Sequence, residues 1–269
     1  MEWTDIGCNL GHESFTDDWP AVLDDARAAG VTRLVVTGAS VAGSDRALEL
    51  AQARPDMLRA TAGVHPHLAS DFDDGAARHL AGLHDQALVA AVGECGLDYF
   101  RDFSPRTDQR RAFEAQLELA ARSAKPVFLH QRDAHDDFVA ILKSFRDRLG
   151  PVVVHCFTDT AEALHDYLDL DCHIGITGWI CDERRGLALK GIVREIPAGR
   201  LMLETDAPYL KPRNLRPKAR THRNEPQWLP WIGGTVAALR GVTPAELAAQ
   251  TTANARAFFR WNGEGDGTA

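Results

Sequence analysis

Eight short apolar segments rich in β-branched residues recur along the 269-residue chain, and stretches with helical periodicity separate them. We interpret each segment as a strand because of its length, its β-branched content and the Gly or Pro nearby. The segments are residues 4–8, 33–37, 59–64, 88–93, 126–129, 152–154, 172–177 and 201–205. This alternation predicts an α/β fold in which a parallel sheet closes into a (β/α)8 TIM barrel. An open doubly wound sheet is the alternative, but the sequence has neither a G-x-G-x-x-G nor a Walker A loop.

Boundary signals of three helices support the alternation. A helical pattern over residues 17–29 stops at Gly30, as is typical of a glycine that follows a helix. Ser104 and Pro105 predict the N-cap and the first position of a second helix. Residues 243–246 (TPAE) predict a capping box at the start of the last helix.

The composition favours one globular domain. No apolar run approaches the roughly 18 residues of a membrane span. No linker divides the chain, so we predict a single domain over residues 1–262 and a short flexible tail over residues 263–269. The five cysteines form no C-x-x-C motif and indicate reduced thiols in a cytoplasmic protein. We take a monomer as the default oligomeric state.

Histidine and acidic residues stand at the predicted carboxyl ends of five strands. These residues are His65, Glu94, His130, His155 and Asp206. The first four are spaced by 29, 36 and 25 residues, and each interval corresponds to one strand–helix unit. Because barrel enzymes assemble their sites at this end, we expect these side chains to meet at one mouth of the barrel.

Two imidazoles and two carboxylates at one mouth predict a metal site formed by Glu94, His130, His155 and Asp206. A bound metal lowers the pKa of its water, and a nearby carboxylate acts as the general base, so we predict catalytic roles for Glu94 and Asp206. Ligand softness favours Mn²⁺, Co²⁺ or Zn²⁺ over Mg²⁺ at such a site. A serine hydrolase is disfavoured because the sequence has no G-x-S-x-G motif.

Eight further segments, in order along nearly the whole chain, form a specific pattern. They are residues 5–10 (DIGCNL), 62–67 (AGVHPH), 93–98 (GECGLD), 126–134 (PVFLHQRDA), 155–158 (HCFT), 175–186 (GITGWICDERRG), 204–210 (ETDAPYL) and 223–226 (RNEP). This pattern resembles the TatD-type metal-dependent deoxyribonucleases. The resemblance implies an amidohydrolase-like metal-dependent hydrolase that acts as a 3′-to-5′ exonuclease on single-stranded DNA and RNA, in DNA repair or nucleic-acid turnover.

The resemblance also implies site residues and a cofactor. It makes Glu94, His130 and His155 metal ligands, and it makes Asp206 the carboxylate that ligates metal and handles the attacking water. It implies Mg²⁺ as the divalent cation in practice. Most of the family begins with D-x-H-x-H, whereas this chain has Gly7 and Asn9 after its first aspartate, which weakens one of two metal positions. Residues that remain for a second metal or for the pocket wall are His65, Asn9 and Glu204.

Basic residues near these strand ends are candidates for phosphate binding. The net charge of −8 argues against a protein that coats nucleic acid regardless of sequence, but residues 211–223 hold six basic residues and no acidic one. The predicted phosphate-binding residues are Arg132, Arg184, Arg185, Arg213, Arg216 and Arg223. Tyr99, Phe100 and Trp179 are candidates for stacking a terminal base, with core packing as the alternative.

Two other functions remain open at this point. The same barrel could hydrolyse a small amide or ester or deacylate aminoacyl-tRNA, because fold alone does not separate these reactions. Many amidohydrolases carry a carboxylated lysine on strand 4, where this chain has Glu94. This difference favours the nuclease hypothesis. A barrel that only binds nucleic acid is the third hypothesis, and its one support is the missing pair of strand 1 histidines.

Overall fold

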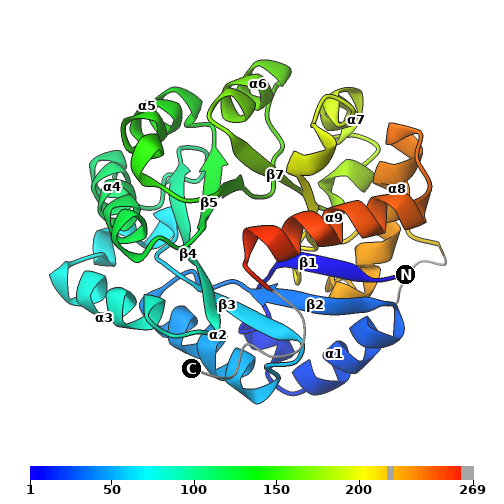
Figure 1. Cartoon of the computed structure of the whole chain (residues 1–269), viewed down its shortest axis with the longest axis horizontal. Helices are drawn as coiled ribbons and strands as arrows, with labels where there is room; N and C mark the ends of the chain where they lie inside the picture. The colour runs from blue at the N-terminus through cyan, green and yellow to red at the C-terminus, as the bar shows by residue number, and fades with distance from the viewer. Residues whose placement is uncertain (217–220, 262–269) are drawn as a thin grey trace.

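Eight parallel strands surrounded by helices form the protein, and the computed structural model describes residues 1–216 and 221–261 (Figure 1). Each strand pairs in parallel with the next one along the chain. The strands are β1 (Trp3–Cys8), β2 (Val31–Val36), β3 (Leu58–Ala62), β4 (Val89–Asp98), β5 (Val127–Arg132), β6 (Val152–Val154), β7 (Cys172–Ile176) and β8 (Leu201–Leu203). At the seam, Asp206 N donates to Gly7 O (2.8 Å) and Asn9 N donates to Ala207 O (2.7 Å). The predicted (β/α)8 TIM barrel is confirmed.

The helices form a ring outside the strands, as Figure 1 shows. They are α1 (Trp19–Ala28), α2 (Val41–Ala53), α3 (Asp74–His84), α4 (Arg106–Ser123), α5 (His135–Phe145), α6 (Ala161–Asp169), α7 (Leu187–Ile192), α8 (Leu229–Arg240) and α9 (Pro244–Phe258). Short 3₁₀ helices occupy several of the connections, among them Pro66–Asp71 after β3 and Gly178–Cys181 after β7. In the described part of the chain, no helix has the length and apolar character needed to cross a membrane.

Two of the three predicted helix boundaries are confirmed. Gly30 follows α1 with a φ of +92°, a conformation that glycine adopts without strain. The capping box at Thr243 and Glu246 is present at the start of α9. The prediction for α4 is wrong by one position, because Pro105 is the N-cap residue. The Ser104 hydroxyl instead donates to His67 O (2.9 Å), which ties the start of α4 to the segment after β3.

Strands β4 and β5 extend beyond their predicted ends at residues 93 and 129. Their ladder continues past Glu94 and pairs Gly96 with His130 and Asp98 with Arg132. Gly96 permits this close pairing because a Cβ there would collide with the His130 carbonyl oxygen, and its φ of +145° suits glycine. The extension brings a second row of inward-facing residues above the first, as strand alternation requires.

Apolar residues close the amino-terminal end of the barrel. Side chains inside the barrel, such as Phe128 and Met202, form one buried cluster with Phe258, Phe259 and Trp261. The last three lie at the end of α9 or just after it, and Figure 1 shows α9 lying across this end of the barrel. Access to the barrel interior is therefore from the carboxyl ends of the strands. Residues 263–269, predicted as a flexible tail, lie outside the described residues, and the domain limit at residue 262 stays a prediction.

Candidate metal centre and substrate cavity

A cavity of about 830 Å³ opens at the carboxyl ends of the strands. Its volume lies within the range of small-molecule sites. The candidate metal, pocket and phosphate-binding residues that line it are Asn9, His65, Glu94, His130, Arg132, His155, Arg185 and Asp206. Those that do not line it are Arg184, Glu204, Arg213, Arg216 and Arg223. The strand ends thus meet at one mouth, as expected, whereas most of the candidate arginines lie elsewhere.

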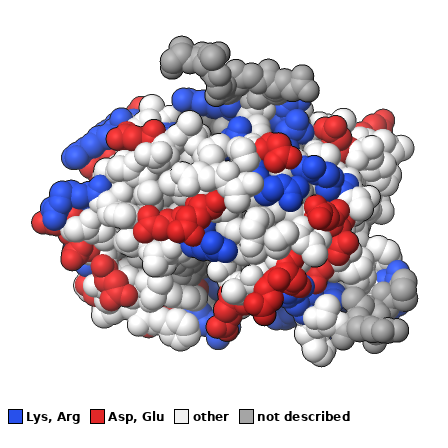
Figure 2. Space-filling view, turned by 90° about the horizontal axis from the view of Figure 1, so that it is seen from below, with Lys and Arg blue, Asp and Glu red and all other residues white. Residues whose placement is uncertain are grey.

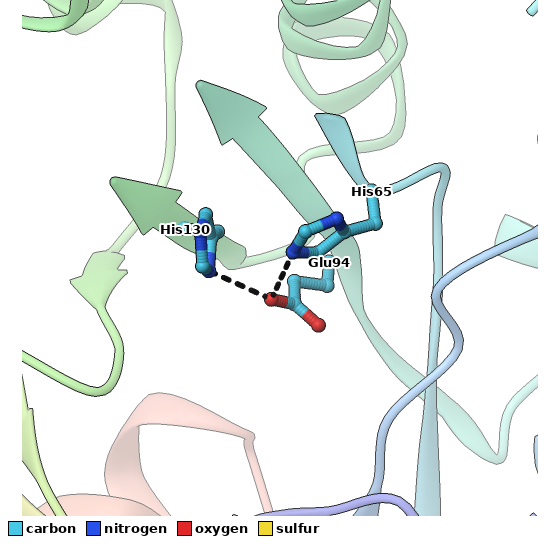
Figure 3. Close-up of side chains that lie close together, drawn as sticks. All are labelled: His65, Glu94 and His130. Atoms are coloured by element: carbon cyan, nitrogen blue, oxygen red, sulfur yellow. Dashed lines mark ion pairs between the residues drawn. The ribbon is translucent and has the colours of Figure 1, made fainter. Parts of the chain in front are cut away.

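One oxygen of Glu94 faces three imidazole rings on the floor of this cavity. Glu94 Oε1 lies 3.3 Å from His65 Nε2 and 3.1 Å from His130 Nδ1, as Figure 3 shows. The same oxygen lies 2.8 Å from His155 Nε2. Ligand atoms of His65, Glu94 and His130 all lie within 4.8 Å of one another. The structure therefore adds His65 to the Glu94, His130 and His155 set.

The protonation of the buried groups in this cluster determines how it can bind a metal. Burial disfavours the charge of Glu94, but the adjacent His65 and His155 outweigh burial and hold the pKa of this carboxylate well below its usual range. Burial lowers the pKa of His65 to about 4, against the pull of Glu94, so its ring is neutral near pH 7. Against the effect of burial, Asp98 and Glu94 raise the pKa of His130, and Glu94 and Glu204 raise that of His155 well above its usual value, so a cation competes with a proton at these two rings. Divalent transition metals bind an ionised carboxylate together with neutral imidazoles. The residues present therefore fit a divalent cation.

Asp98 orients His130 from the second row of β4. Asp98 Oδ2 lies 3.3 Å from His130 Nε2 and 2.8 Å from His67 Nε2, and only 2% of the Asp98 side chain is exposed. Burial opposes the charge of Asp98, but its contacts with His130 and His67 outweigh burial and lower the pKa of this carboxyl. A carboxylate on the outer ring nitrogen fixes the tautomer of a metal-binding histidine. The sequence analysis missed Asp98, although period-2 alternation from Glu94 places it on the same face of β4.

Glu204 plays the corresponding part for His155. Its side chain is fully buried, and Glu204 Oε2 lies 3.3 Å from His155 Nδ1 while Oε1 accepts a hydrogen bond from Cys156 N (2.5 Å). The carboxylate fills the space beside Gly7, because a Cβ at Gly7 would collide with Glu204 Oε2. The glycine that departs from the usual D-x-H-x-H start thus makes room for this carboxylate.

Asp206 lies on the cavity wall at the seam of the barrel. Asn9 Nδ2 donates to Asp206 Oδ1 (3.0 Å). The amide therefore holds one carboxylate oxygen and is not one of the candidate metal ligands around Glu94. Just before it, Thr205 donates from its backbone and hydroxyl to the buried Asp5, which fixes the chain as it leaves β8. Burial raises the pKa of Asp206 to about 7, although the charge of His155 acts in the opposite direction. A carboxyl with a raised pKa is a better proton acceptor than an ordinary aspartate.

Most of the candidate arginines are paired with acidic residues in the described part of the chain. Arg213 pairs with Glu183 (3.1 Å), and Arg223 pairs with Asp18 (2.7 Å) and with Glu225 (2.9 Å). Arg185 lines the cavity but also pairs with Asp182 (2.9 Å), whose pair with Arg184 is longer at 3.7 Å. Arg216 donates to the carbonyl oxygen of its neighbour Leu215. The phosphate-binding roles of these residues stay predictions.

Aromatic rings surround the cavity mouth, but the predicted stacking residues already have cationic neighbours. Arg132 lies 4.0 Å from the ring centroid of Phe100, and Arg185 lies 4.3 Å from that of Trp179. Tyr99 donates from its hydroxyl to Asp137 (2.6 Å) and does not line the cavity. Phe100 and Trp179 line the cavity, and so do two exposed rings that the sequence analysis missed, Phe103 (68%) and Tyr209 (51%). Both follow strand ends, β4 and β8, and this position is the signal that could have found them.

Comparisons with known proteins show the family and the fold of the chain. The family described as TatD related DNase matches residues 4–260. The protein named 3′-5′ ssDNA/RNA exonuclease TatD from Edwardsiella piscicida is 50% identical over 256 residues, which cover 95% of this chain and 98% of the relative. A solved TatD homologue from Escherichia coli K12 has a TM-score of 0.87 at 29% identity and covers 96% of this chain and 98% of its own. An uncharacterised amidohydrolase from Saccharomyces cerevisiae has a TM-score of 0.84 at 25% identity, over 96% and 99%.

Proposed function

The chain belongs to the TatD-related DNase family, and on this premise we propose that it is a metal-dependent 3′-to-5′ exonuclease on single-stranded DNA and RNA. The observation that carries the proposal is the group of imidazoles around Glu94 on the floor of a cavity, in a chain that is 50% identical to an exonuclease of this specificity. Hydrolysis of a phosphodiester at a strand terminus needs charge stabilisation at the phosphate and a proton acceptor for water. The cavity offers a donor set for a cation and the Asp206 carboxylate for these two purposes.

The residues that would hold a divalent cation are Glu94, His65, His130 and His155. When bound, such a cation supplies positive charge that stabilises the developing negative charge on the phosphate and lowers the pKa of water. Asp98 and Glu204 orient His130 and His155 by accepting at the ring nitrogens that point away from Glu94.

Asp206 is the proton acceptor in this proposal. Asn9 donates to its Oδ1, and no hydrogen bond from the described residues reaches its Oδ2, which can accept a proton from the attacking water. The seam hydrogen bond from Asp206 N to Gly7 O fixes its backbone and thus its position over the floor of the cavity. Arg132 and Arg185 supply cationic groups on the cavity wall for substrate phosphates.

The outer surface gives little attraction for nucleic acid on the side that Figure 2 draws. Acidic and basic side chains are interspersed there without a continuous basic band, and the net charge is −8. Non-specific binding to nucleic acid requires clustered Lys and Arg. We therefore assign substrate binding to the cavity mouth.

Three finer assignments belong to the same proposal. Mg²⁺ is the cation that family membership favours, while the imidazole donors would also suit Mn²⁺ or Zn²⁺. The cytoplasm is the location we propose, since all five cysteines have free thiols as expected in a reducing compartment. A monomer acting in DNA repair and nucleic-acid turnover completes the proposal.

Degradation of a single-stranded oligonucleotide labelled at its 5′ end tests the function. With Mg²⁺ or Mn²⁺ we expect a descending ladder of labelled products, because removal of nucleotides from the 3′ end retains the label on every intermediate. EDTA should abolish the ladder by removing the cation. A labelled oligonucleotide that stays intact with either metal would reject the nuclease function and direct attention to amide, ester and aminoacyl-tRNA substrates.

Replacing Glu204 by glutamine is expected to weaken metal binding by about 10- to 100-fold, the usual effect of losing the partner of a metal-binding histidine. The amide would place a donor against either His155 Nδ1 or Cys156 N, both of which Glu204 now contacts. Calorimetric titration with Mn²⁺ measures the affinity without relying on turnover. Glu195→Gln is the matched control, because Glu195 is an exposed glutamate that also contacts a histidine, His165, at 2.8 Å. This variant should leave the Mn²⁺ affinity unchanged. Equal affinity in the Glu204 variant would show that His155 needs no orienting carboxylate.

A further inference from the structure

Arg132 differs from Arg185 on the same cavity wall because its guanidinium has no acidic partner among the described residues. Among residues 1–216 and 221–261, no carboxylate lies within ion-pair distance of its guanidinium, which also donates no hydrogen bond. Its contacts are with aromatic rings: the guanidinium carbon lies 4.0 Å from the ring centroid of Phe100 and 6.0 Å from that of Trp179. Arg185, on the same wall, is by contrast held by Asp182.

Contacts with aromatic rings orient a guanidinium without using its hydrogen-bond donors. Arginine stacks on aromatic faces, while its five N–H groups remain in the plane of the guanidinium. These donors match the oxygens of a phosphate in bidentate geometry. Arg132 is thus a preoriented cation whose donors have no partner in the described protein. It lines the same cavity as the candidate metal ligands around Glu94.

The position of Arg132 relative to that cluster is set by the strand. Arg132 is two residues beyond His130 on β5, and the ladder pairs it with Asp98 just as it pairs His130 with Gly96. Alternate residues of a strand face the same side and are separated by about 6.6 Å, twice the rise per residue. This separation is comparable with one step between successive phosphates of an extended nucleic-acid strand.

We propose that Arg132 binds the phosphate one nucleotide to the 5′ side of the scissile phosphate, so that the enzyme recognises a strand end with two phosphates rather than an isolated phosphodiester. The inference rests on the proposed function, because a 3′-terminal nucleotide ends in a hydroxyl and its only neighbouring phosphate lies on the 5′ side. Arg101, 5.5 Å from the same Phe100 ring, is a second cation for this subsite that the sequence analysis missed.

The direction of approach follows from the neighbouring carboxylates. A smaller cavity of about 190 Å³ lies beside Arg132 and is also lined by Asp133 and Asp159. Two carboxylates would repel a phosphate, whereas they can accept hydrogen bonds from sugar hydroxyl or base amino groups. The phosphate therefore reaches Arg132 from the main cavity, on the side where Glu94 and the candidate metal-binding histidines lie.

A comparison of a dinucleotide with a trinucleotide tests the proposal, since only the trinucleotide carries a phosphate 5′ of the scissile one. For the wild-type protein we expect a kcat/KM about 10- to 100-fold higher for the trinucleotide, the effect of a charge-assisted hydrogen-bonded contact. Arg132→Gln should remove this preference by lowering kcat/KM for the trinucleotide to that for the dinucleotide. A trinucleotide whose 5′-side phosphate is a neutral methylphosphonate should lose the same preference in wild type and show no further loss in the variant.

Equilibrium binding of the same ligands in EDTA gives a readout that does not depend on turnover. We expect tighter binding of the trinucleotide by wild type and equal binding of both ligands by Arg132→Gln, with Arg122→Gln on the exposed surface of α4 as the matched control. Equal binding of the two ligands by wild type, or an equal loss for both in the variant, would overturn the subsite. If wild type binds with this preference but hydrolyses nothing, the proposed function fails while the phosphate subsite stands.

Discussion

Replacement of Glu94 by alanine is expected to lower kcat/KM on single-stranded DNA by on the order of 10³-fold and to abolish tight binding of a divalent cation. Its Oε1 atom faces His65, His130 and His155 at 2.8 to 3.3 Å, so every candidate metal ligand on the cavity floor loses its common carboxylate. Several kcal/mol of charge stabilisation at the phosphate would disappear with the cation. The variant should therefore lose both DNA hydrolysis and the heat of Mn²⁺ binding in a calorimetric titration.

A matched control separates this loss from a loss of folding. Glu118→Ala removes a carboxylate from α4 that is one-third exposed and paired with Arg148 at 2.7 Å, and a surface pair contributes at most about 1 kcal/mol. We expect this control to hydrolyse DNA as wild type does, with thermal unfolding recorded for all three proteins. The wild-type protein in EDTA should hydrolyse DNA as slowly as the Glu94→Ala variant does. Activity within tenfold of wild type in Glu94→Ala would remove this carboxylate from the metal centre.

The cavity floor could be predicted from the sequence because strand order and strand ends determine it. Glu94, His130 and His155 each follow an apolar run, and the carboxyl ends of parallel strands meet at one mouth. Asp98 was missed because the predicted strand stopped at residue 93, whereas the β4–β5 ladder continues to Arg132. That continuation depends on the close backbone approach at Gly96, which is a tertiary feature.

The phosphate-binding arginines could not be predicted in the same way, because a sequence shows which residues are charged but not which of them form ion pairs. Arg213 looked available for phosphate, yet it pairs with Glu183, which lies 30 residues away along the chain. Arg223 pairs with Asp18 across 205 residues. Arg132 has no such partner among the described residues and lines the cavity, and its aromatic neighbours in space, Phe100 and Trp179, distinguish it.

Asp206→Asn is expected to lower kcat by about 10²- to 10⁴-fold with little change in KM, the range typical of losing a general base. The substitution removes basicity while preserving geometry. The new side chain can still accept from Asn9 Nδ2 at Oδ1, the contact now 3.0 Å long. Asp206 has a φ of +53°, and asparagine is among the residues that adopt this left-handed conformation most readily. Steady-state kinetics on a single-stranded oligonucleotide would measure both constants.

Asparagine is a sharper test than alanine at this position, since alanine at positive φ adds backbone strain that would also lower activity. Asp171→Asn provides the matched control: Asp171 has a φ of +57° and lies just before β7, at the opposite end of the barrel from the cavity. That control should retain wild-type kcat, which excludes a general effect of exchanging aspartate for asparagine at positive φ. If Asp206→Asn retained kcat within tenfold of wild type, another group would have to accept the proton. Glu94 is engaged by three imidazoles and Asp98 by two, so no other carboxylate of the described cavity wall is as free to do so as Asp206.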